Sequence, residues 1–296
     1  MSRIVVTGSS GLIGTALVAA LHERGDEVVR LVRRAPRSPD EVQWDPSTRR
    51  LDPHVLDGVD GVVNLAGAGV GDKRWTPAHK RDILASRVDS TTALATAVAT
   101  ADHPVRLVSG SAVGYYGDRG DEELTEASPP GTGFLSDVVL AWEAATQPAV
   151  DAGASVALVR TGIVLAPEGG AMKPLLRLGR FGLGGPLGSG RQFMPWITLT
   201  DEVGAILHLR DRPDVTGPVN LSALEPARQR DIATALGRAL HRPAVLPAPS
   251  VALHLVLGEF AGEILGGQRI VGDALRDSGY TFTHADLESA IRWLVA

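Results

Sequence analysis

The fold is decided by one stretch near the beginning of the chain, Arg3-Ile-Val-Val-Thr7-Gly8-Ser-Ser-Gly11-Leu-Ile-Gly14. The apolar run over 3–7 predicts a buried strand, and apolar residues at helical spacing over 12–24 predict the helix that follows. Between them, Gly8 permits a tight turn, Gly11 leaves room for a pyrophosphate, and Gly14 lets the helix pack close to the strand. Because the turn lies between a strand and a helix, we interpret it as a dinucleotide-binding loop rather than an ordinary glycine turn.

The second predicted strand, over 27–32, indicates which dinucleotide binds. An NAD site places an acidic residue after this strand to bond the ribose 2′-hydroxyl. This chain has Arg33 and Arg34 there instead, and Asp40 and Glu41 come too late. Two guanidinium groups can grip a 2′-phosphate through paired hydrogen bonds. We therefore predict NADP(H) as the cofactor; the alternative is a pair of solvated arginines at a strand end.

Strands and helices alternate through the rest of the first half of the chain. Strands are predicted at 61–65, 105–109 and 155–160, and helices at 77–100 and 134–152. This alternation is typical of a parallel sheet that helices cover on both faces. The predicted fold class is therefore α/β, a Rossmann-type doubly wound parallel sheet with a smaller C-terminal α+β subdomain.

The predicted domain limits follow from a change in composition after Arg160. The next 30 residues or so are rich in glycine, whereas a later apolar run at 219–221 predicts one more strand. The assignment is 1–165 to an NADP-binding Rossmann domain, to which 196–221 return, and 166–195 with 222–296 to a lid or substrate subdomain.

The composition argues against several classes of protein. The 296 residues carry a formal net charge of −5, so no overall basic character favours nucleic acid or an anionic membrane. The chain has no cysteine, and its eight histidines show no metal-ligand spacing. No apolar run approaches the roughly 20 residues of a membrane span. We predict a cytoplasmic protein that acts on a small molecule, without a metal, nucleic acid or membrane segment, and with a homodimer as one option for its assembly.

Two motifs resemble the short-chain dehydrogenase/reductase superfamily, in its extended or atypical branch. Thr7 to Gly14 matches the TGxxGxxG loop, and Asn64-Leu65-Ala66-Gly67 matches the NxAG signature. A narrower resemblance, to the nucleoside-diphosphate-sugar epimerase subgroup of the NAD-dependent epimerase/dehydratase family, rests on segments spread over nearly the whole chain. These segments are Trp44-Asp45, Ser86-Arg87, SAVGYYG (111–117), Trp142-Glu143-Ala144-Ala145, RTGIVL (160–165), GLGGPLGSGRQ (182–192), Pro195-Trp196-Ile197, GPVNL (217–221) and Gly267-Gln268-Arg269.

This resemblance implies where a cofactor would lie, although it supplies no substrate. Arg34, with Arg33, would hold the 2′-phosphate, and Leu65 and Ala66 would line the adenosine side. Asp82 and Arg87 lie five residues apart on the long helix and would face the cofactor, unless both are surface charges. The predicted cofactor-binding residues are Gly8, Ser9, Ser10, Gly11, Leu12, Ile13, Arg33, Arg34, Leu65, Ala66, Gly67, Asp82, Arg87, Ser109, Arg160 and Val164.

The resemblance also reveals a missing catalytic pair. Reductases of the superfamily use a tyrosine and a lysine four residues later, because a phenol of pKa about 10 needs a neighbouring cation to act near neutral pH. Counting back from Glu143, the tyrosine position falls on Phe134 or Leu135, and the lysine position on Val138 or Val139. None of these four side chains can transfer a proton.

Other polar residues could replace this pair. Ser111 aligns with the active-site hydroxyl of the family, and Tyr115 and Tyr116 follow in a segment predicted to face the substrate. We predict these three as catalytic; the alternative for the tyrosines is aromatic packing. Glu143 is either a general base or a helix residue that holds a neighbouring loop. The glycine-rich loop 182–190 either offers backbone amides to an anion such as a sugar diphosphate or forms a flexible lid.

Two functions remain open at this point. One is an NADP(H)-binding oxidoreductase or epimerase-like protein that acts on a small carbonyl compound or a nucleotide sugar. The other is a non-catalytic NADP(H)-binding redox sensor or interaction protein. The missing tyrosine and lysine favour the sensor, whereas the lid favours the enzyme. We prefer the enzyme, because a lid needs something to cover.

Overall fold

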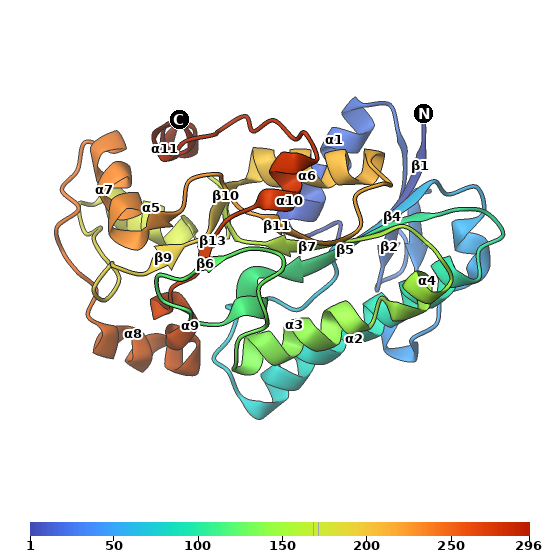
Figure 1. The fold of residues 1–296 in the computed structure, drawn as a ribbon, viewed down its shortest axis with the longest axis horizontal. Coiled ribbons are helices and arrows are strands. Elements are labelled where there is room, and N and C mark those ends of the chain that lie inside the picture. The colour runs from blue at the N-terminus through green and yellow to red at the C-terminus, as the bar shows by residue number, and fades with distance from the viewer. Residues whose placement is uncertain (168, 171) are drawn as a thin grey trace.

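A computed structural model describes residues 1–167, 169–170 and 172–296. Within them, seven parallel strands form a central sheet with helices on both faces, which confirms the predicted Rossmann-type doubly wound fold (Figure 1). Across the sheet the strands run in the order β11 (Gly217–Leu221), β7 (Val156–Thr161), β5 (Arg106–Ala112), β4 (Gly61–Asn64), β1 (Arg3–Thr7), β2 (Glu27–Val32) and β3 (Glu41–Gln43).

The alternation of side chains along β1 divides the core between the two faces. Ile4 and Val6 pack with Leu17 and Ile206 on one face, whereas Val5 packs with apolar residues on the other. The first face is covered by α1 (Leu12–Glu23) and α6 (Leu199–Asp211), and the second by α2 (Pro77–Ala99), α3 (Phe134–Ala144) and α4 (Gln147–Asp151) (Figure 1).

Two local predictions differ from the structure. The helix predicted as continuous over 134–152 is broken into α3 and α4. Pro148 explains the break, because it has no N–H to donate to the carbonyl of Ala144. The edge strand β3 was not predicted, since three residues are too few to show an alternating pattern.

The order of the strands reverses between β1 and β4. From β1 the chain proceeds through β2 to β3 on one side, and from β4 it proceeds through β5 and β7 to β11 on the other. In open α/β sheets, ligands bind outside the carboxyl ends of the strands at such a reversal. The glycine turn follows β1 and the NxAG motif follows β4, so both lie at this point.

Most elements outside the central sheet and its covering helices gather beyond the carboxyl ends of the sheet strands (Figure 1). Several of them share a separate apolar cluster that includes Met172, Trp196, Ile232 and Ile291. The paired short strands are β8 (Ile163–Leu165) with β10 (Trp196–Thr198), β9 (Phe193–Met194) with β12 (Ala227–Arg228), and β6 (Glu123–Leu124) with β13 (Arg269–Ile270); the helices are α5 (Met172–Arg180), α7 (Gln229–Ala239), α8 (Ser250–Leu257), α9 (Ala261–Leu265), α10 (Asp273–Asp277) and α11 (Leu287–Val295).

The predicted domain limits remain a prediction. Leu275 of α10 packs into the apolar cluster that α1 and α6 form against the sheet, so part of 222–296 contacts the Rossmann core. Residues 168 and 171, which belong to the predicted segment 166–195, lie outside the described residues. None of the helices in the described part of the chain combines the length and the hydropathy of a membrane span.

Candidate functional site

The glycine turn after β1 allows backbone segments to approach closely. Gly8 has a φ of +65°, and a Cβ there would lie 2.4 Å from the carbonyl oxygen of Leu65. A Cβ on Gly14 would lie 2.2 Å from the carbonyl oxygen of Gly8. Gly11 is the N-cap of α1, and no described side chain caps the helix there. The first N–H groups of α1 therefore keep their hydrogen-bonding capacity and form the positive end of the helix, which suits a pyrophosphate.

A buried chain of hydrogen bonds joins the ends of β1 and β4. Thr7 Oγ1 donates to Asn64 Oδ1 at 2.7 Å and accepts from the backbone N–H of Leu65 at 3.1 Å. Asn64 Nδ2 donates to Thr91 Oγ1 at 2.8 Å, and Trp142 Nε1 donates to the same oxygen at 2.9 Å. The two motifs that carried the family resemblance are thus fixed to each other and to the helices behind them.

The loop after β2 gathers three exposed arginines, Arg33, Arg34 and Arg37. Arg34 donates two hydrogen bonds to the carboxylate of Glu41, at 2.7 and 2.6 Å. Glu41 also accepts from the backbone N–H of Arg37 at 2.7 Å. The hydrogen bond from Arg34 is the main cause that lowers the pKa of Glu41 to about 2. Sequence reasoning passed over Arg37 and considered Glu41 only as a misplaced ribose ligand; the pairing of β2 with β3 brings Glu41 to the loop.

The two charged residues predicted on the long helix differ in their surroundings. Arg87 is partly buried and donates to the carbonyl oxygens of Ala68 at 2.9 Å and Ile83 at 3.1 Å. Burial lowers the pKa of Arg87 to about 10, so the side chain stays protonated at neutral pH. A Cβ on Gly67 would lie 3.0 Å from Arg87 Cζ, which places the guanidinium directly against the NxAG loop. Asp82 is exposed on the same helix.

The remaining predicted cofactor residues lie near the same edge of the sheet. Ser9 and Ser10 belong to the glycine turn, and Leu12 and Ile13 open α1. Ser109 is buried in β5 opposite Asn64, while Val164 lies in β8 just beyond β7. The roles of these residues toward a cofactor remain predictions.

Ser111, Glu143 and Arg160 form a buried polar group. Glu143 Oε1 accepts from Ser111 Oγ at 2.6 Å and from Arg160 Nε at 2.8 Å, and Oε2 accepts from Arg160 Nη2 at 2.9 Å. The side chains of Glu143 and Arg160 are only 12% and 3% exposed. Burial by itself would lower the pKa of Arg160, but the hydrogen bonds and charge of Glu143 raise it above its ordinary value. Glu143 thus holds a hydroxyl and a guanidinium on β5 and β7.

The two tyrosines occupy a short 3-10 helix, Val113–Tyr116, and play different parts. Tyr116 is completely buried; its hydroxyl donates to Asn220 Oδ1 at 2.7 Å and accepts from Arg160 Nη1 at 3.0 Å. Burial raises the pKa of Tyr116. Tyr115 is half-buried, and its ring centre lies 3.5 Å from Arg160 Cζ. Tyr116 is thus packed in the core with its hydroxyl bonded on both sides, whereas Tyr115 stays partly exposed; the roles of both tyrosines toward a substrate remain predictions.

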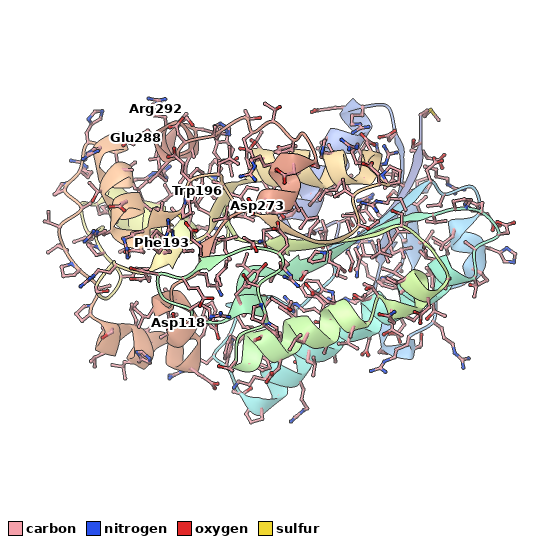
Figure 2. The ribbon with its side chains drawn as sticks, viewed as in Figure 1. Asp118, Phe193, Trp196, Asp273, Glu288 and Arg292 are labelled. Atoms are coloured by element: carbon pink, nitrogen blue, oxygen red, sulfur yellow. The ribbon has the colours of Figure 1, made fainter. Side chains whose placement is uncertain are left out.

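The loop after the tyrosines is fixed to the C-terminal part of the chain. Asp118, labelled in Figure 2, accepts through Oδ1 from the backbone N–H of Gly267 at 2.9 Å. Arg119 N donates to the Gly267 carbonyl at 3.0 Å, and Gln268 Nε2 donates to the Gly117 carbonyl at 3.0 Å. The segment Gly267-Gln268-Arg269 therefore positions the region next to Tyr115.

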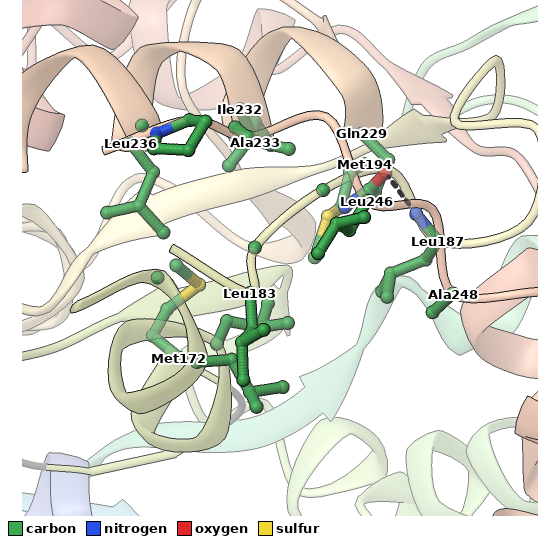
Figure 3. A pocket seen from close by; sticks show the side chains of 18 residues that line it. Met172, Leu183, Leu187, Met194, Gln229, Ile232, Ala233, Leu236, Leu246 and Ala248 are labelled. Atoms are coloured by element: carbon green, nitrogen blue, oxygen red, sulfur yellow. Dashed lines mark hydrogen bonds between the residues drawn. The ribbon is translucent and has the colours of Figure 1, made fainter. Parts of the chain in front are cut away.

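An apolar pocket lies between α5, α7 and the glycine-rich loop (Figure 3). Its cavity measures about 60 Å³, whereas pockets for small-molecule ligands span roughly 300–1,000 Å³. None of the predicted site residues lines it. Much of the loop's hydrogen-bonding capacity is already used, which leaves few amides for a diphosphate; the backbone N–H groups that donate within the protein are those of Gly182, Leu183, Leu187, Gly188 and Gly190.

The parallel sheet, the glycine turn at its reversal point and the serine on β5 define the class as an extended short-chain dehydrogenase/reductase type of protein. Comparison with known proteins makes this more specific. The chain belongs to the NAD dependent epimerase/dehydratase family, whose model matches residues 4–221. A domain of unknown function, DUF1731, matches residues 248–294.

Relatives match the chain over almost its whole length. The epimerase family protein Mb2239 of Mycobacterium bovis is 45% identical over 289 residues, which are 97% of this chain and 96% of that protein. The crystal structure of human epimerase family protein SDR39U1 (isoform2) with NADPH has a TM-score of 0.91 at 35% identity and covers 99% of both chains. A nucleoside-diphosphate sugar epimerase from Corynebacterium glutamicum has a TM-score of 0.80 at 36% identity, over 99% of this chain and 58% of that one.

Proposed function

We propose that this protein binds NADP(H) and acts as an oxidoreductase or epimerase on a small carbonyl compound or a nucleotide sugar. The observation that carries the proposal is the glycine turn, whose backbone segments pack closely at Gly8 and Gly14 and leave the N-terminus of α1 without a side-chain cap. An uncapped helix N-terminus, whose first N–H groups are free to donate, suits a pyrophosphate. The exposed arginines after β2 suit a 2′-phosphate, and a human relative has been crystallised with NADPH.

The chemistry divides between the cofactor and the chain. A bound nicotinamide would supply hydride exchange with a substrate carbon. The chain would supply the proton transfer and the position of the substrate oxygen. We assign Tyr115 as the group that exchanges a proton with that oxygen, because its ring lies against the Arg160 guanidinium and borders the loop fixed to the C-terminal part. Ser111 Oγ donates its hydrogen bond to Glu143, so it would orient the substrate oxygen by accepting a hydrogen bond from the hydroxyl form of the substrate.

A second function has its own supporting observation. The positions of the missing tyrosine and lysine on α3 are occupied by apolar side chains: Phe134 packs against Trp75 at 4.9 Å between ring centres, and Val138 and Val139 are buried. A chain that retains a cofactor turn without the usual proton-transfer pair suits a redox sensor or an interaction protein. Homodimer formation and a cytoplasmic location also remain proposals.

The test begins with the cofactor. We expect NADPH to bind about 10–100-fold more tightly than NADH in fluorescence titrations, since hydrogen bonds to a charged group contribute about 1.5–3 kcal/mol. Oxidation of bound NADPH is then followed against a panel of small carbonyl compounds and nucleotide sugars. Tighter binding of NADH would overturn the assignment of the cofactor. Tight NADPH binding without turnover of any panel member would favour the sensor.

The two tyrosines offer a matched pair of variants for the enzyme. Tyr115→Phe is expected to lower kcat by about 100-fold at unchanged affinity for NADPH, because it removes the proposed proton donor. Tyr116→Phe is expected to lower thermal stability with a small change in kcat, because it leaves the buried Asn220 Oδ1 without its donor. Steady-state kinetics and melting curves of both variants decide; an unchanged kcat for Tyr115→Phe would contradict the assignment.

A further inference from the structure

We propose that Glu41 is a positioning residue. It orients the guanidinium of Arg34 so that one edge of this group can bind a phosphate monoester, and it thereby favours a 2′-phosphorylated dinucleotide over an unphosphorylated one. This inference rests on the proposed binding of NADP(H).

The guanidinium of Arg34 has five N–H groups, and three of them donate hydrogen bonds within the structure. One on Nη1 and one on Nη2 donate to the two oxygens of Glu41, at 2.7 and 2.6 Å. The other on Nη1 donates to the Ala35 carbonyl at 3.0 Å. This leaves Nε–H and the second N–H of Nη2, which no described residue accepts.

These two remaining donors point in parallel from the same edge of the planar group. Together they make one complete fork, the arrangement that binds a carboxylate or a phosphate through two hydrogen bonds. The side chain of Arg34 is 43% exposed. The pair with Glu41 thus occupies one end of the guanidinium and leaves a whole fork for an outside anion.

Glu41 is itself held in place. Its side chain is only 2% exposed, and it begins the edge strand β3. It accepts the backbone N–H of Arg37 at 2.7 Å, and Arg30 Nη2 lies 3.4 Å from its Oε1. A long arginine side chain anchored by such a fixed carboxylate loses less freedom when an anion binds, which favours binding.

The surrounding charge allows an anion to approach despite the carboxylate. Glu41 and Arg34 neutralise each other as a pair, and Arg33 and Arg37 add two exposed positive charges on the same loop. The loop therefore stays positive overall at the end of β2. The opposite expectation, that Glu41 repels the phosphate, predicts tighter NADPH binding when its charge is removed.

Glu41→Gln tests the inference, with the dissociation constants of NADPH and NADH measured by fluorescence titration. We expect the Kd of NADPH to rise about tenfold, because the loss of orientation weakens a charge-assisted fork by about 1.4 kcal/mol. The Kd of NADH is expected to stay within about twofold. Glu41→Asp, which keeps the charge but shortens the side chain, is expected to give an intermediate loss.

A matched control is Glu27→Gln, which removes a glutamate paired with Arg3 at the opposite, amino end of β2. It is expected to leave both dissociation constants unchanged. Tighter NADPH binding by Glu41→Gln, or an equal loss for both cofactors, would overturn the inference. If Arg34→Met abolishes the preference while Glu41→Gln keeps it, only this inference fails; if the unmodified chain shows no preference for NADPH, the proposed function fails.

Discussion

Arg160→Met is expected to lower the free energy of unfolding by about 3–5 kcal/mol at pH 7, the cost of removing one partner of a buried ion pair. The methionine would leave Glu143, whose side chain is 12% exposed, with the hydroxyl of Ser111 as its one remaining donor among the described residues. It would also remove the 3.0 Å hydrogen bond to Tyr116. Urea unfolding curves measure the change.

A double-mutant cycle separates the ion pair from packing. Glu143→Met removes the other partner, and the double variant Arg160→Met/Glu143→Met removes both charges. We expect the double variant to be more stable than Arg160→Met alone, because a neutral pair of similar volume avoids an uncompensated buried charge. If the two single effects simply add, the charges do not interact and the interpretation of the pair is wrong.

The polar group of Ser111, Glu143 and Arg160 could be predicted from the sequence only in part. The turn at Gly8, Gly11 and Gly14 was predictable because its residues are contiguous and each has a backbone requirement. Ser111 could be aligned, but its partners Glu143 and Arg160 come from α3 and β7. Their proximity depends on how the helix packs on the sheet, which no local pattern encodes.

In the loop after β2, a contact between residues close in sequence was also not predictable from a local pattern. Arg33 and Arg34 were noticed because they follow a strand where an acid is usual. Glu41 was set aside by its position in the sequence, yet the pairing of Arg30 with Glu41 across β2 and β3 returns it to the loop. A three-residue edge strand is too short to be predicted, so neither its partner nor the salt bridge could be foreseen.

The glycine-rich loop shows the limit of composition as evidence. Its glycines suggested free amides for an anion, but several amides donate within the protein, including that of Gly188 to the Ala248 carbonyl at 2.8 Å. Glycine content indicates conformational freedom. It does not reveal whether the backbone donors face outward or are already bonded to a neighbouring segment.

Glu202 is expected to make the free energy of unfolding depend strongly on pH. It is completely buried on α6; Oε1 accepts from Thr161 Oγ1 at 2.7 Å, and Oε2 has no partner among the described residues. Burial raises the pKa of Glu202 from 4.5 to about 8. Between these values the folded chain keeps a proton that the unfolded chain releases. The carboxyl therefore stabilises the fold below about pH 4.5, and this stability is lost as pH rises toward 8.

The expected loss is about 1.4 kcal/mol per pH unit, or about 5 kcal/mol across the whole interval. Glu202→Gln cannot ionise, so its free energy of unfolding should rise relative to the unmodified chain as pH increases from 5 to 8. A constant change in the free energy of unfolding, caused by the buried amide, would shift the curve without changing this slope.

Glu225→Gln, at an exposed position, is the control, and its curve should run parallel to that of the unmodified chain, because an exposed carboxyl group is solvated in both states. Urea unfolding at half-unit pH steps measures all three proteins. Parallel curves for Glu202→Gln and the unmodified chain would mean that the pKa of Glu202 is not raised by folding, which would contradict the prediction.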